Sequence, residues 1–422
     1  ASHTCGMRDQ WNLLTMAGWR MDDVITKEHV LTMVSRQKEL NFQPGEEYYY
    51  CNTGFTLLAE VVARVSEKSF AEFMQERVFE PQKMEKTLFY EDHEKVVKYR
   101  AYSYYPNQMK MKKSVLSYAN VGATSMKTTA EDLCRWAMNL THPKVGSKKI
   151  IDLMNTEAKL NDGSTFGGAL GQFVTPHKGL HQIQHGGADA GYRSYIGRFP
   201  EQDFAVVVLS NHAWFNPNQK ALEIADIYLK DHFVEKEEIP TMVEAIVAKA
   251  SAKPLKKYEG FYWNDRGNYS RKINLQDDTL RYSRGNSESP LVPIGGNKFQ
   301  MLTAEVKLIV ELTEEDMKVV VNDDEPIISK EYKPIEYSSK ELMELTGTFY
   351  SEELGTSYQI LLEDKQLIIQ HLRTGRATMN PVKEDFFNSS AWYMGNIQFV
   401  RNKEGQIKGL TMSNGRVRNL WF

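Results

Sequence analysis

The chain has 422 residues, too many for one compact core, which predicts two or three domains. It is 41% hydrophobic and 25% charged, and its net charge of −3 with both signs scattered argues against a nucleic-acid partner or a polybasic membrane contact. No apolar run approaches the roughly 18 to 20 residues that span a bilayer. The three cysteines have the spacing of neither a metal site nor a disulfide framework, so we expect no metal and no cofactor.

Residues 1–235 mix helical and strand patterns. Apolar residues at helical spacing predict a buried helix over 53–65, followed by a second helical stretch over 66–79. A third helix is expected to begin after Thr129, its predicted N-cap, with Asp132 as the N3 acceptor that answers the cap.

A β-hairpin is predicted over 192–199 and 204–210, with a turn at 200–203. Its second arm is a continuous apolar run, so we expect both faces of that strand to be covered. A sheet with helices on both faces fits an α/β domain.

Residues 236–254 read as a linker with one short helix, because glutamates and Pro240 precede an amphipathic segment that ends at Lys253-Pro254. Beyond the linker the chain is mostly strand, and its pattern repeats. Apolar residues fall 13, 15 and 20 positions after a glycine in both copies: Ile273, Leu275 and Leu280 after Gly260, and Ile360, Leu362 and Leu367 after Gly347. Pro293 with Phe299 is matched to Pro381 with Phe386.

Shared spacing of this kind indicates the duplication of one unit. We expect two small antiparallel β-barrels, one over 255–336 and one over 337–422. One open sandwich that spans both copies is the alternative.

Two short motifs could carry chemistry: Tyr50-Cys51-Asn52 and His185-Gly186-Gly187. If the first is extended, its phenol and carboxamide point the same way, and nearby positive charge could lower the pKa of the phenol from about 10. In the second, an open backbone at Gly187-Ala188 could pair with a substrate strand and donate the Ala188 N–H to an oxyanion. Each motif alone is weak, because aromatic clusters and glycine turns produce the same letters.

Order and context make the motifs specific. Four segments resemble, in order, the penicillin-binding, serine β-lactamase-like hydrolases: His3-Thr4-Cys5-Gly6, 44–55, 122–133 and 185–194. The resemblance is to the class C-like branch, with its D-aminopeptidase and esterase-type serine hydrolases. It implies an α+β or α/β catalytic domain over 1–235, an antiparallel sheet flanked by helices, and barrels similar to the accessory domains of D-aminopeptidases.

The resemblance also implies roles for six residues. Tyr50 would be the general base or proton relay, and His185 would stand where the branch often has lysine. The Ala188 N–H would be an oxyanion donor, and Asn52 would bind substrate together with Gly186 and Gly187.

The first motif of this family, Ser-x-x-Lys, carries the nucleophile and is expected upstream of His3. Because the chain begins at Ala1, we expect that it is N-terminally truncated and that this fragment is inactive. The pair Ser35 and Lys38 has the right spelling but lies on the wrong side of His3 and on a solvated helix face, so we interpret it as a chance match.

The function implied is a serine hydrolase that acts through an acyl-enzyme on an amide or ester: a D-amino acid peptide, a peptidoglycan fragment or a small ester. An extracytoplasmic location is implied too. The alternative is a non-catalytic pseudoenzyme that serves as a binding or scaffold protein. Ligand carriage by the barrels has little support, because small barrels are filled by side chains. We expect the upstream segment or a second copy of the chain to cover an apolar face.

Overall fold

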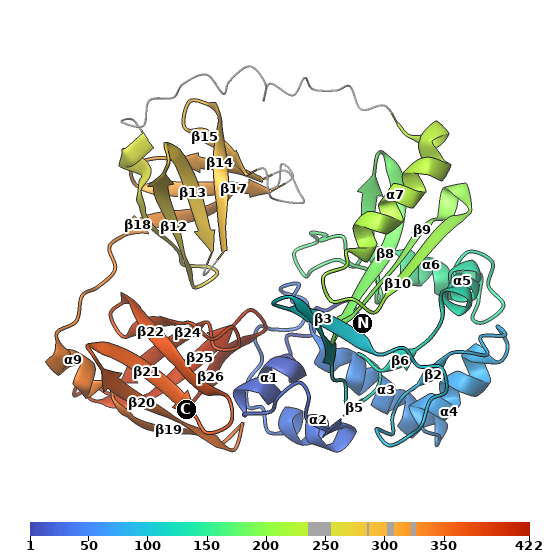
Figure 1. The fold of residues 1–422 in the computed structure, drawn as a ribbon, viewed down its shortest axis with the longest axis horizontal. Coiled ribbons are helices and arrows are strands. Elements are labelled where there is room, and N and C mark those ends of the chain that lie inside the picture. The colour runs from blue at the N-terminus through green and yellow to red at the C-terminus, as the bar shows by residue number, and fades with distance from the viewer. Residues whose placement is uncertain (235–254, 285–286, 302–307, 322–325) are drawn as a thin grey trace.

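The computed structural model describes residues 1–234, 255–284, 287–301, 308–321 and 326–422, and the predicted linker over 236–254 lies outside them. An N-terminal part of mixed helices and strands is followed by two antiparallel β-barrels (Figure 1). The predicted fold class is therefore confirmed. The domain limits at 235, 255, 336 and 337 stay predictions.

Three helices of the N-terminal part lie close to the ranges predicted for them, and the others were not predicted by range. They are α1 (Gln10–Met16), α2 (Lys27–Ser35), α3 (Asn52–Ser66), α4 (Phe70–Met74), the π-helix η1 (Gln75–Phe79), α5 (Ala130–Asn139), α6 (Lys148–Asn155), η2 (Pro200–Gln202), α7 (Pro217–Leu229) and η3 (Lys230–His232). The helix predicted over 53–65 is α3, and Glu67 ends it with a left-handed φ of 56°. The second stretch is α4 and η1 together, begun by a capping box of Ser69 and Glu72.

Helix α5 begins at the predicted cap. The side chain of Thr129 accepts the backbone N–H of Asp132. The predicted reciprocal hydrogen bond is wrong, because the Asp132 carboxylate does not accept the backbone N–H of Thr129. It accepts instead from the Lys86 N–H and the Thr87 hydroxyl, each at 2.8 Å, and so ties the start of α5 to a distant segment.

The central sheet is antiparallel, with the order β10-β9-β8-β7. Its strands are β7 (Phe173–His177), β8 (Leu180–Asp189), β9 (Tyr192–Phe199) and β10 (Phe204–Ser210), so the predicted hairpin is present. Phe204, Val206 and Val208 pack against α7, whereas Leu209 is 37% exposed. The expected cover on both faces is incomplete for β10: α7 and α5 both contact this strand, but Ala205 and Leu209, on the face opposite Val206, stay exposed.

Three small two-stranded sheets complete this part. They are β1 (Ile25–Thr26) with β5 (Tyr118–Ala119), β2 (Leu88–Phe89) with β6 (Met126–Lys127), and β3 (Ser103–Asn107) with β4 (Lys110–Ser114). In the described part of the chain, no helix combines the length and the apolar character that crossing a bilayer requires.

Barrel 1 is closed and follows η4 (Lys256–Tyr258). Its strands are β11 (Gly260–Asn264), β12 (Tyr269–Gln276), β13 (Thr279–Arg284), β14 (Ser287–Gly295), β15 (Lys298–Met301), β16 (Leu308–Leu312), β17 (Asp316–Val321) and β18 (Ile327–Tyr332). Its own core holds Ile273, Leu280 and Phe299.

Barrel 2 follows α9 (Ser339–Glu344), and its eight-stranded sheet curls without a ladder between its first and last strands. Its strands are β19 (Gly347–Ser351), β20 (Thr356–Glu363), β21 (Gln366–His371), β22 (Gly375–Lys383), β23 (Phe386–Ser389), β24 (Asn396–Arg401), β25 (Ile407–Asn414) and β26 (Val417–Trp421). Two separate barrels exclude the single open sandwich.

The repeated glycine spacing encodes one strand register. Gly260 lies opposite Ile273 in barrel 1, and Gly347 lies opposite Ile360 in barrel 2. One detail of the match is wrong: Pro293 faces Phe299, but Pro381 faces Phe387 rather than Phe386. The buried residue equivalent to Phe299 is therefore Phe387, and the adjacent Phe386 packs instead against barrel 1.

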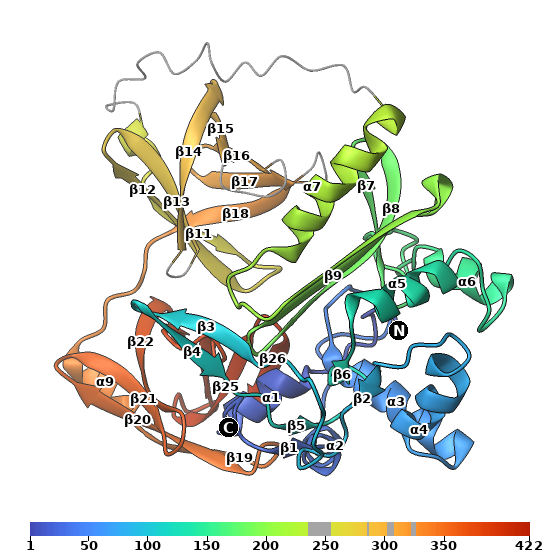
Figure 2. The same ribbon diagram turned by 45° about the vertical axis from the view of Figure 1, so that its right-hand side comes forward.

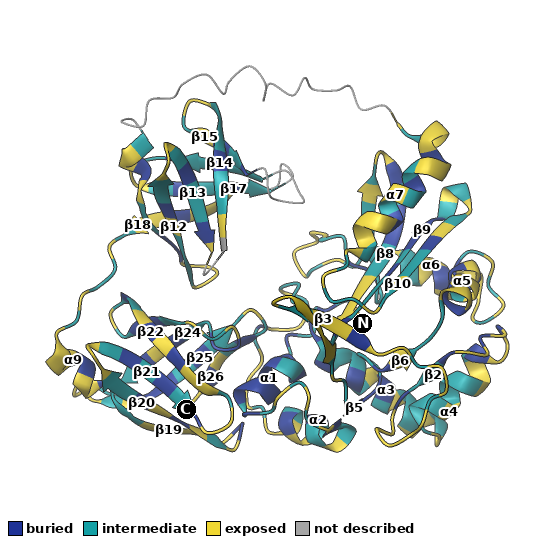
Figure 3. Ribbon diagram, in the orientation of Figure 1, coloured by how far each residue is buried: buried dark blue, intermediate teal, exposed yellow. Residues whose placement is uncertain are grey.

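Barrel 2 is joined to the N-terminal part by a common core. One apolar cluster contains Leu13, Leu14 and Met16 of α1 together with residues of β20 to β26. Buried residues of α1 and of barrel 2 are dark blue in Figure 3. The fully buried Tyr358 donates its hydroxyl to the Met16 carbonyl at 2.9 Å. A second view shows α1 seated against this barrel (Figure 2). Barrel 2 thus completes the core around the N-terminal helices.

Candidate active site

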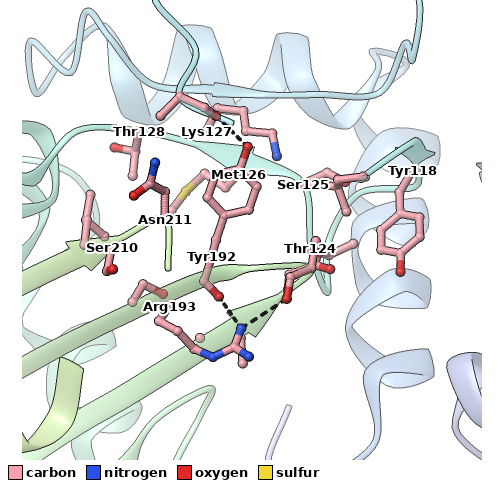
Figure 4. A pocket seen from close by; sticks show the side chains of 18 of the residues that line it. Tyr118, Thr124, Ser125, Met126, Lys127, Thr128, Tyr192, Arg193, Ser210 and Asn211 are labelled. Carbon is pink, nitrogen blue, oxygen red and sulfur yellow. Dashed lines mark hydrogen bonds between the residues drawn. The ribbon is translucent and has the colours of Figure 1, made fainter. Parts of the chain in front are cut away.

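Both sequence motifs line one cleft, which has a volume of about 2400 Å³. Its walls include every residue that was predicted for the site: Tyr50, Asn52, His185, Gly186, Gly187 and Ala188. Another part of the wall, with Lys127, Tyr192 and Arg193, is shown in Figure 4. The cleft exceeds the roughly 300 to 1,000 Å³ of common small-molecule pockets, so it has room for a peptide-sized ligand.

Tyr50 and His185 meet across the cleft. The Tyr50 hydroxyl lies 3.5 Å from the Nε2 of His185, and the Nδ1 of the same ring lies 2.5 Å from the Gly186 carbonyl oxygen. A carbonyl only accepts, so Nδ1 carries the hydrogen of the neutral ring and Nε2 is left as an acceptor for the phenol. Burial lowers the pKa of His185, which favours this neutral form.

The ring of Tyr50 has two further neighbours. The His3 imidazole stacks on it with a centroid distance of 4.0 Å, and the guanidinium of Arg416 lies 4.8 Å from its centroid. Burial raises the pKa of Tyr50 and outweighs the positive charge of Arg416, which acts in the opposite direction. The expected lowering of the Tyr50 pKa is therefore wrong in sign, and the phenol is protonated at neutral pH.

His3 holds the tyrosine motif in place. Its Nδ1 accepts the Cys51 backbone N–H at 3.0 Å, and its carbonyl accepts the Tyr49 N–H at 2.9 Å. Burial lowers the pKa of His3 to about 4, so the ring is neutral and can remain an acceptor. Cys51 is 3% exposed and does not line the cleft.

Cys51 is the N-cap of α3, and Asn52 is the first residue of this helix. The extended conformation considered for the motif therefore ends before Asn52. Its backbone N–H and its side-chain Nδ2 both donate to one carboxylate oxygen of Asp9, each at 2.7 Å. The Asp9 oxygen accepts from both groups, which assigns Nδ2 to the Asp9 side. Among the described residues no donor binds Oδ1 of Asn52, so this oxygen can accept from a ligand N–H. Asp9 is fully buried and also caps α1 through the Trp11 N–H.

The glycine motif lies on the part of β8 that continues beyond the end of its neighbour β7. The last β7–β8 pair is Phe173 with Gln184, whereas β9 continues beside β8 to Asp189. In an antiparallel ladder, hydrogen-bonded pairs alternate, and the tight loop after Asp189 makes Asp189 and Tyr192 such a pair. The N–H of Ala188 therefore points away from β9, toward the side that β7 has left open.

Gly187 leaves room for the side chain of Ser194 on β9. A Cβ at this position would lie 2.2 Å from the Oγ of Ser194. A glycine at this position leaves room for the neighbouring strand without displacing that hydroxyl.

The chance match of Ser-x-x-Lys lies outside the cleft. Ser35 donates its hydroxyl to the Thr32 carbonyl at 3.0 Å, and Lys38 pairs with the exposed Glu352 of barrel 2 at 2.6 Å. Neither side chain faces Tyr50 or His185, so this pair has the surroundings of a surface helix end.

Four further residues of the cleft wall were not predicted. Asp189 accepts a hydrogen bond from the Thr124 hydroxyl, and burial raises its pKa. Burial lowers the pKa of Lys127 to about 8. Arg416 comes from barrel 2, near the other end of the chain, so no local pattern around Tyr50 could have revealed it.

Known proteins of similar sequence include a D-aminopeptidase and a penicillin-binding protein. A D-aminopeptidase of Gluconobacter oxydans (strain 621H) is 21% identical over 212 residues, which are 50% of this chain and 40% of that protein. Penicillin-binding protein 4* of Bacillus subtilis (strain 168) is 25% identical over 227 residues, 50% of each chain. The chain thus spans half or less of the length of these curated relatives.

The octameric penicillin-binding protein homologue from Pyrococcus abyssi has a similar fold, with a TM-score of 0.50 and 21% identity over 78% of this chain and 76% of that one. Residues 331–422 match a family described as a domain of unknown function (DUF3471). Residues 1–228, more than half of the chain, match the family model described as beta-lactamase, and the chain therefore belongs to the beta-lactamase family.

Proposed function

We propose that this cleft transfers the acyl group of an amide or ester through an acyl-enzyme, with D-amino acid amides and peptides as the first substrates to test. The observation that carries the proposal is the convergence of the Tyr50–His185 pair, the free Oδ1 of Asn52 and the open edge at Ala188 on one cleft. The relatives named D-aminopeptidase and penicillin-binding protein support the same class of reaction.

Each group has a step in this reaction. A serine oxygen attacks the carbonyl carbon, and the negative oxygen that forms accepts the Ala188 N–H. The proton of the serine reaches the leaving amine or alcohol by way of Tyr50, whose hydroxyl is held by His185 Nε2. Asn52 Oδ1 accepts an N–H of the substrate. Water then displaces the serine from the acyl group.

The serine of this scheme is the one in the Ser-x-x-Lys motif that the family resemblance places upstream of His3. The test therefore compares the 422-residue chain with the protein expressed from its complete gene, each treated with a fluorophosphonate and with D- and L-phenylalanine amide. We expect an adduct on an upstream serine and preferential release of ammonia from the D-amide. The shorter chain should give neither, and labelling of Ser35 would overturn this assignment.

Non-catalytic binding remains the second candidate, because the only Ser-x-x-Lys pair of the described residues faces away from Tyr50. Ligand binding by the complete gene product without an adduct or turnover would favour this candidate. The extracytoplasmic location implied by the resemblance is part of the first proposal, and fractionation of the producing cells tests it.

An apolar face also needs a partner. Leu58, Val61 and Val65 lie on one side of α3 and are 43%, 54% and 82% exposed. We infer that an upstream segment or a second copy covers this face, and the relative from Pyrococcus abyssi is described as octameric. Light scattering with intact mass spectrometry distinguishes the two, and a monomer that binds no apolar dye would contradict both.

A further inference from the structure

Barrel 2 presents a turn to the cleft, and the N-terminal part fixes that turn. The carbonyl of Arg416, between β25 and β26, accepts from the Asp9 backbone N–H at 3.2 Å and from Asn41 Nδ2 at 3.1 Å. Asn414 Oδ1 accepts the Arg416 N–H at 2.8 Å and Asn12 Nδ2 at 3.1 Å. Both sides of the interface therefore determine where the Arg416 side chain starts.

The guanidinium of Arg416 lies over the Tyr50 ring and lines the cleft. Among the described residues, no carboxylate pairs with it and no acceptor binds its five N–H donors. Arg418, two residues further along the chain, differs: both of its terminal nitrogens lie 2.9 Å from the Glu47 carboxylate. Arg418 is thus used to hold the barrel, whereas Arg416 has its fork of donors available at the cleft.

The charge of the cleft favours an anion. Among the described residues of its wall there are eight cationic side chains and three carboxylates, so the field inside is positive. The cations are Lys86, Lys95, Lys98, Arg100, Lys113, Lys127, Arg193 and Arg416, and the carboxylates are Asp22, Glu85 and Asp189. Arg193 is already bound, because its guanidinium donates to the Ala190 and Tyr192 carbonyls. Among these cations, Arg416 is the one placed on the ring of Tyr50.

We propose that Arg416 binds a carboxylate carried by the ligand of this cleft, so that barrel 2 supplies a specificity-determining residue beside Tyr50. A planar guanidinium matches a carboxylate through two parallel hydrogen bonds, and stacking on an aromatic ring pre-orients it. The inference rests on the proposed function for its identification of that ligand as the substrate.

The test measures binding and needs no turnover. Isothermal titration of the 422-residue chain compares two pairs of ligands that differ only in a carboxylate. One pair is N-acetyl-D-alanyl-D-alanine and its C-terminal amide, with the charge on the leaving group. The other is N-succinyl-D-alanine amide and N-succinamoyl-D-alanine amide, with the charge on the acyl group. We expect the acid of at least one pair to bind about tenfold or more tightly than its amide.

Three variants test whether Arg416 causes the tighter binding of the acid. Arg416→Gln should bring the affinity of the acid down to that of the amide and leave the amide unchanged. Arg416→Lys should keep part of the preference, because the charge remains but the fork is lost. Arg418→Gln, two residues further along in β26, should keep all of it. A general structural effect of Arg416→Gln would weaken the amide as well.

Equal binding of acid and amide in both pairs would overturn the inference, as would a preference that survives Arg416→Gln or a chain that binds none of the four ligands. These outcomes are separate from the test of function. Serine labelling with no acid preference removes only the role of Arg416. An acid preference that depends on Arg416, without labelling or turnover of the complete gene product, removes the acyl-transfer proposal and leaves a carboxylate-binding cleft.

Discussion

The backbone N–H and the side-chain amide of Asn52 share a single carboxylate oxygen of Asp9, each at 2.7 Å. This contact joins the start of α1 to the start of α3 and sets which atom of Asn52 faces the cleft. A buried carboxylate that satisfies three donors is expected to stabilise the fold as well as the site.

Replacement of Asp9 by asparagine tests this contact. Asp9→Asn removes the carboxylate and allows the Asn52 carboxamide to rotate so that Oδ1 and Nδ2 exchange places. We therefore expect the free energy of unfolding to fall by about 2 kcal/mol. Urea denaturation measures the change. Asp22→Asn is the control, since the Asp22 pair with Arg20 is exposed and should change stability by less than about 0.5 kcal/mol. Equal stability of Asp9→Asn and the parent would contradict this account.

Tyr50→Phe tests the proton relay. In the complete gene product, loss of the hydroxyl should lower kcat about 100-fold or more, because Tyr50 carries the proton in the proposed scheme. Stability should change by less than about 1 kcal/mol, since the recorded hydrogen bond is long at 3.5 Å. The adjacent Tyr49 does not line the cleft, so Tyr49→Phe should keep its kcat. An unchanged kcat in Tyr50→Phe would remove Tyr50 from the mechanism.

The lowered pKa of His3 should make the folded chain less stable in acid. Its pKa is about 4 in the folded chain and about 6.5 when unfolded, so between these pH values the unfolded chain binds a proton that the folded chain excludes. The free energy of unfolding that depends on neutral His3 is fully present above pH 6.5. It is lost as the pH falls toward 4, and the total loss is about 2 kcal/mol.

His3→Asn is a matched control for this effect. Asparagine offers an acceptor to the Cys51 N–H, does not titrate, and tolerates the positive φ of 59° at this position. Denaturation curves at pH 7 and pH 4.5 should show a smaller acid loss in His3→Asn than in the parent. Identical losses would show that other groups cause the acid lability.

The docking of barrel 2 depends on a buried ion pair. Arg8 is fully buried and lies 2.8 Å from Glu353, whereas the neighbouring Glu352 pairs with Lys38 in solvent. Glu353→Gln leaves the buried guanidinium with Glu39, 3.9 Å away and mostly exposed, as its remaining counter-charge, and should destabilise the chain by about 3 kcal/mol. Glu352→Gln should cost less than about 0.5 kcal/mol. Similar denaturation midpoints for the two variants would contradict this distinction.

Much of the fold was predictable because local patterns encode it. The cap at Thr129 and the glycine spacing after Gly260 and Gly347 each fix a helix start or a strand register within a short stretch. The site motifs were found for a similar reason, since Tyr50 and His185 each stand in a recognisable segment.

The rest depends on contacts between distant segments. Asp9 and Arg416 meet at Tyr50 only after barrel 2 has packed against α1, and neither has a sequence signature. The sign of the Tyr50 pKa shift was wrong because burial, which outweighs the charge of Arg416, is a property of the assembled cleft. The edge position of β10 likewise follows from sheet order.

The core shared by α1 and barrel 2 bears on how the protein is made. The ribosome releases α1 early and barrel 2 several hundred residues later. Leu13, Leu14 and Met16 of α1 nevertheless share one apolar cluster with residues of barrel 2. During synthesis these side chains stay exposed until the strands of barrel 2 have emerged, and such surfaces attract chaperones or aggregate. The Tyr50 cleft is therefore complete only once barrel 2 has emerged and packed, because Arg416 of this barrel lines it.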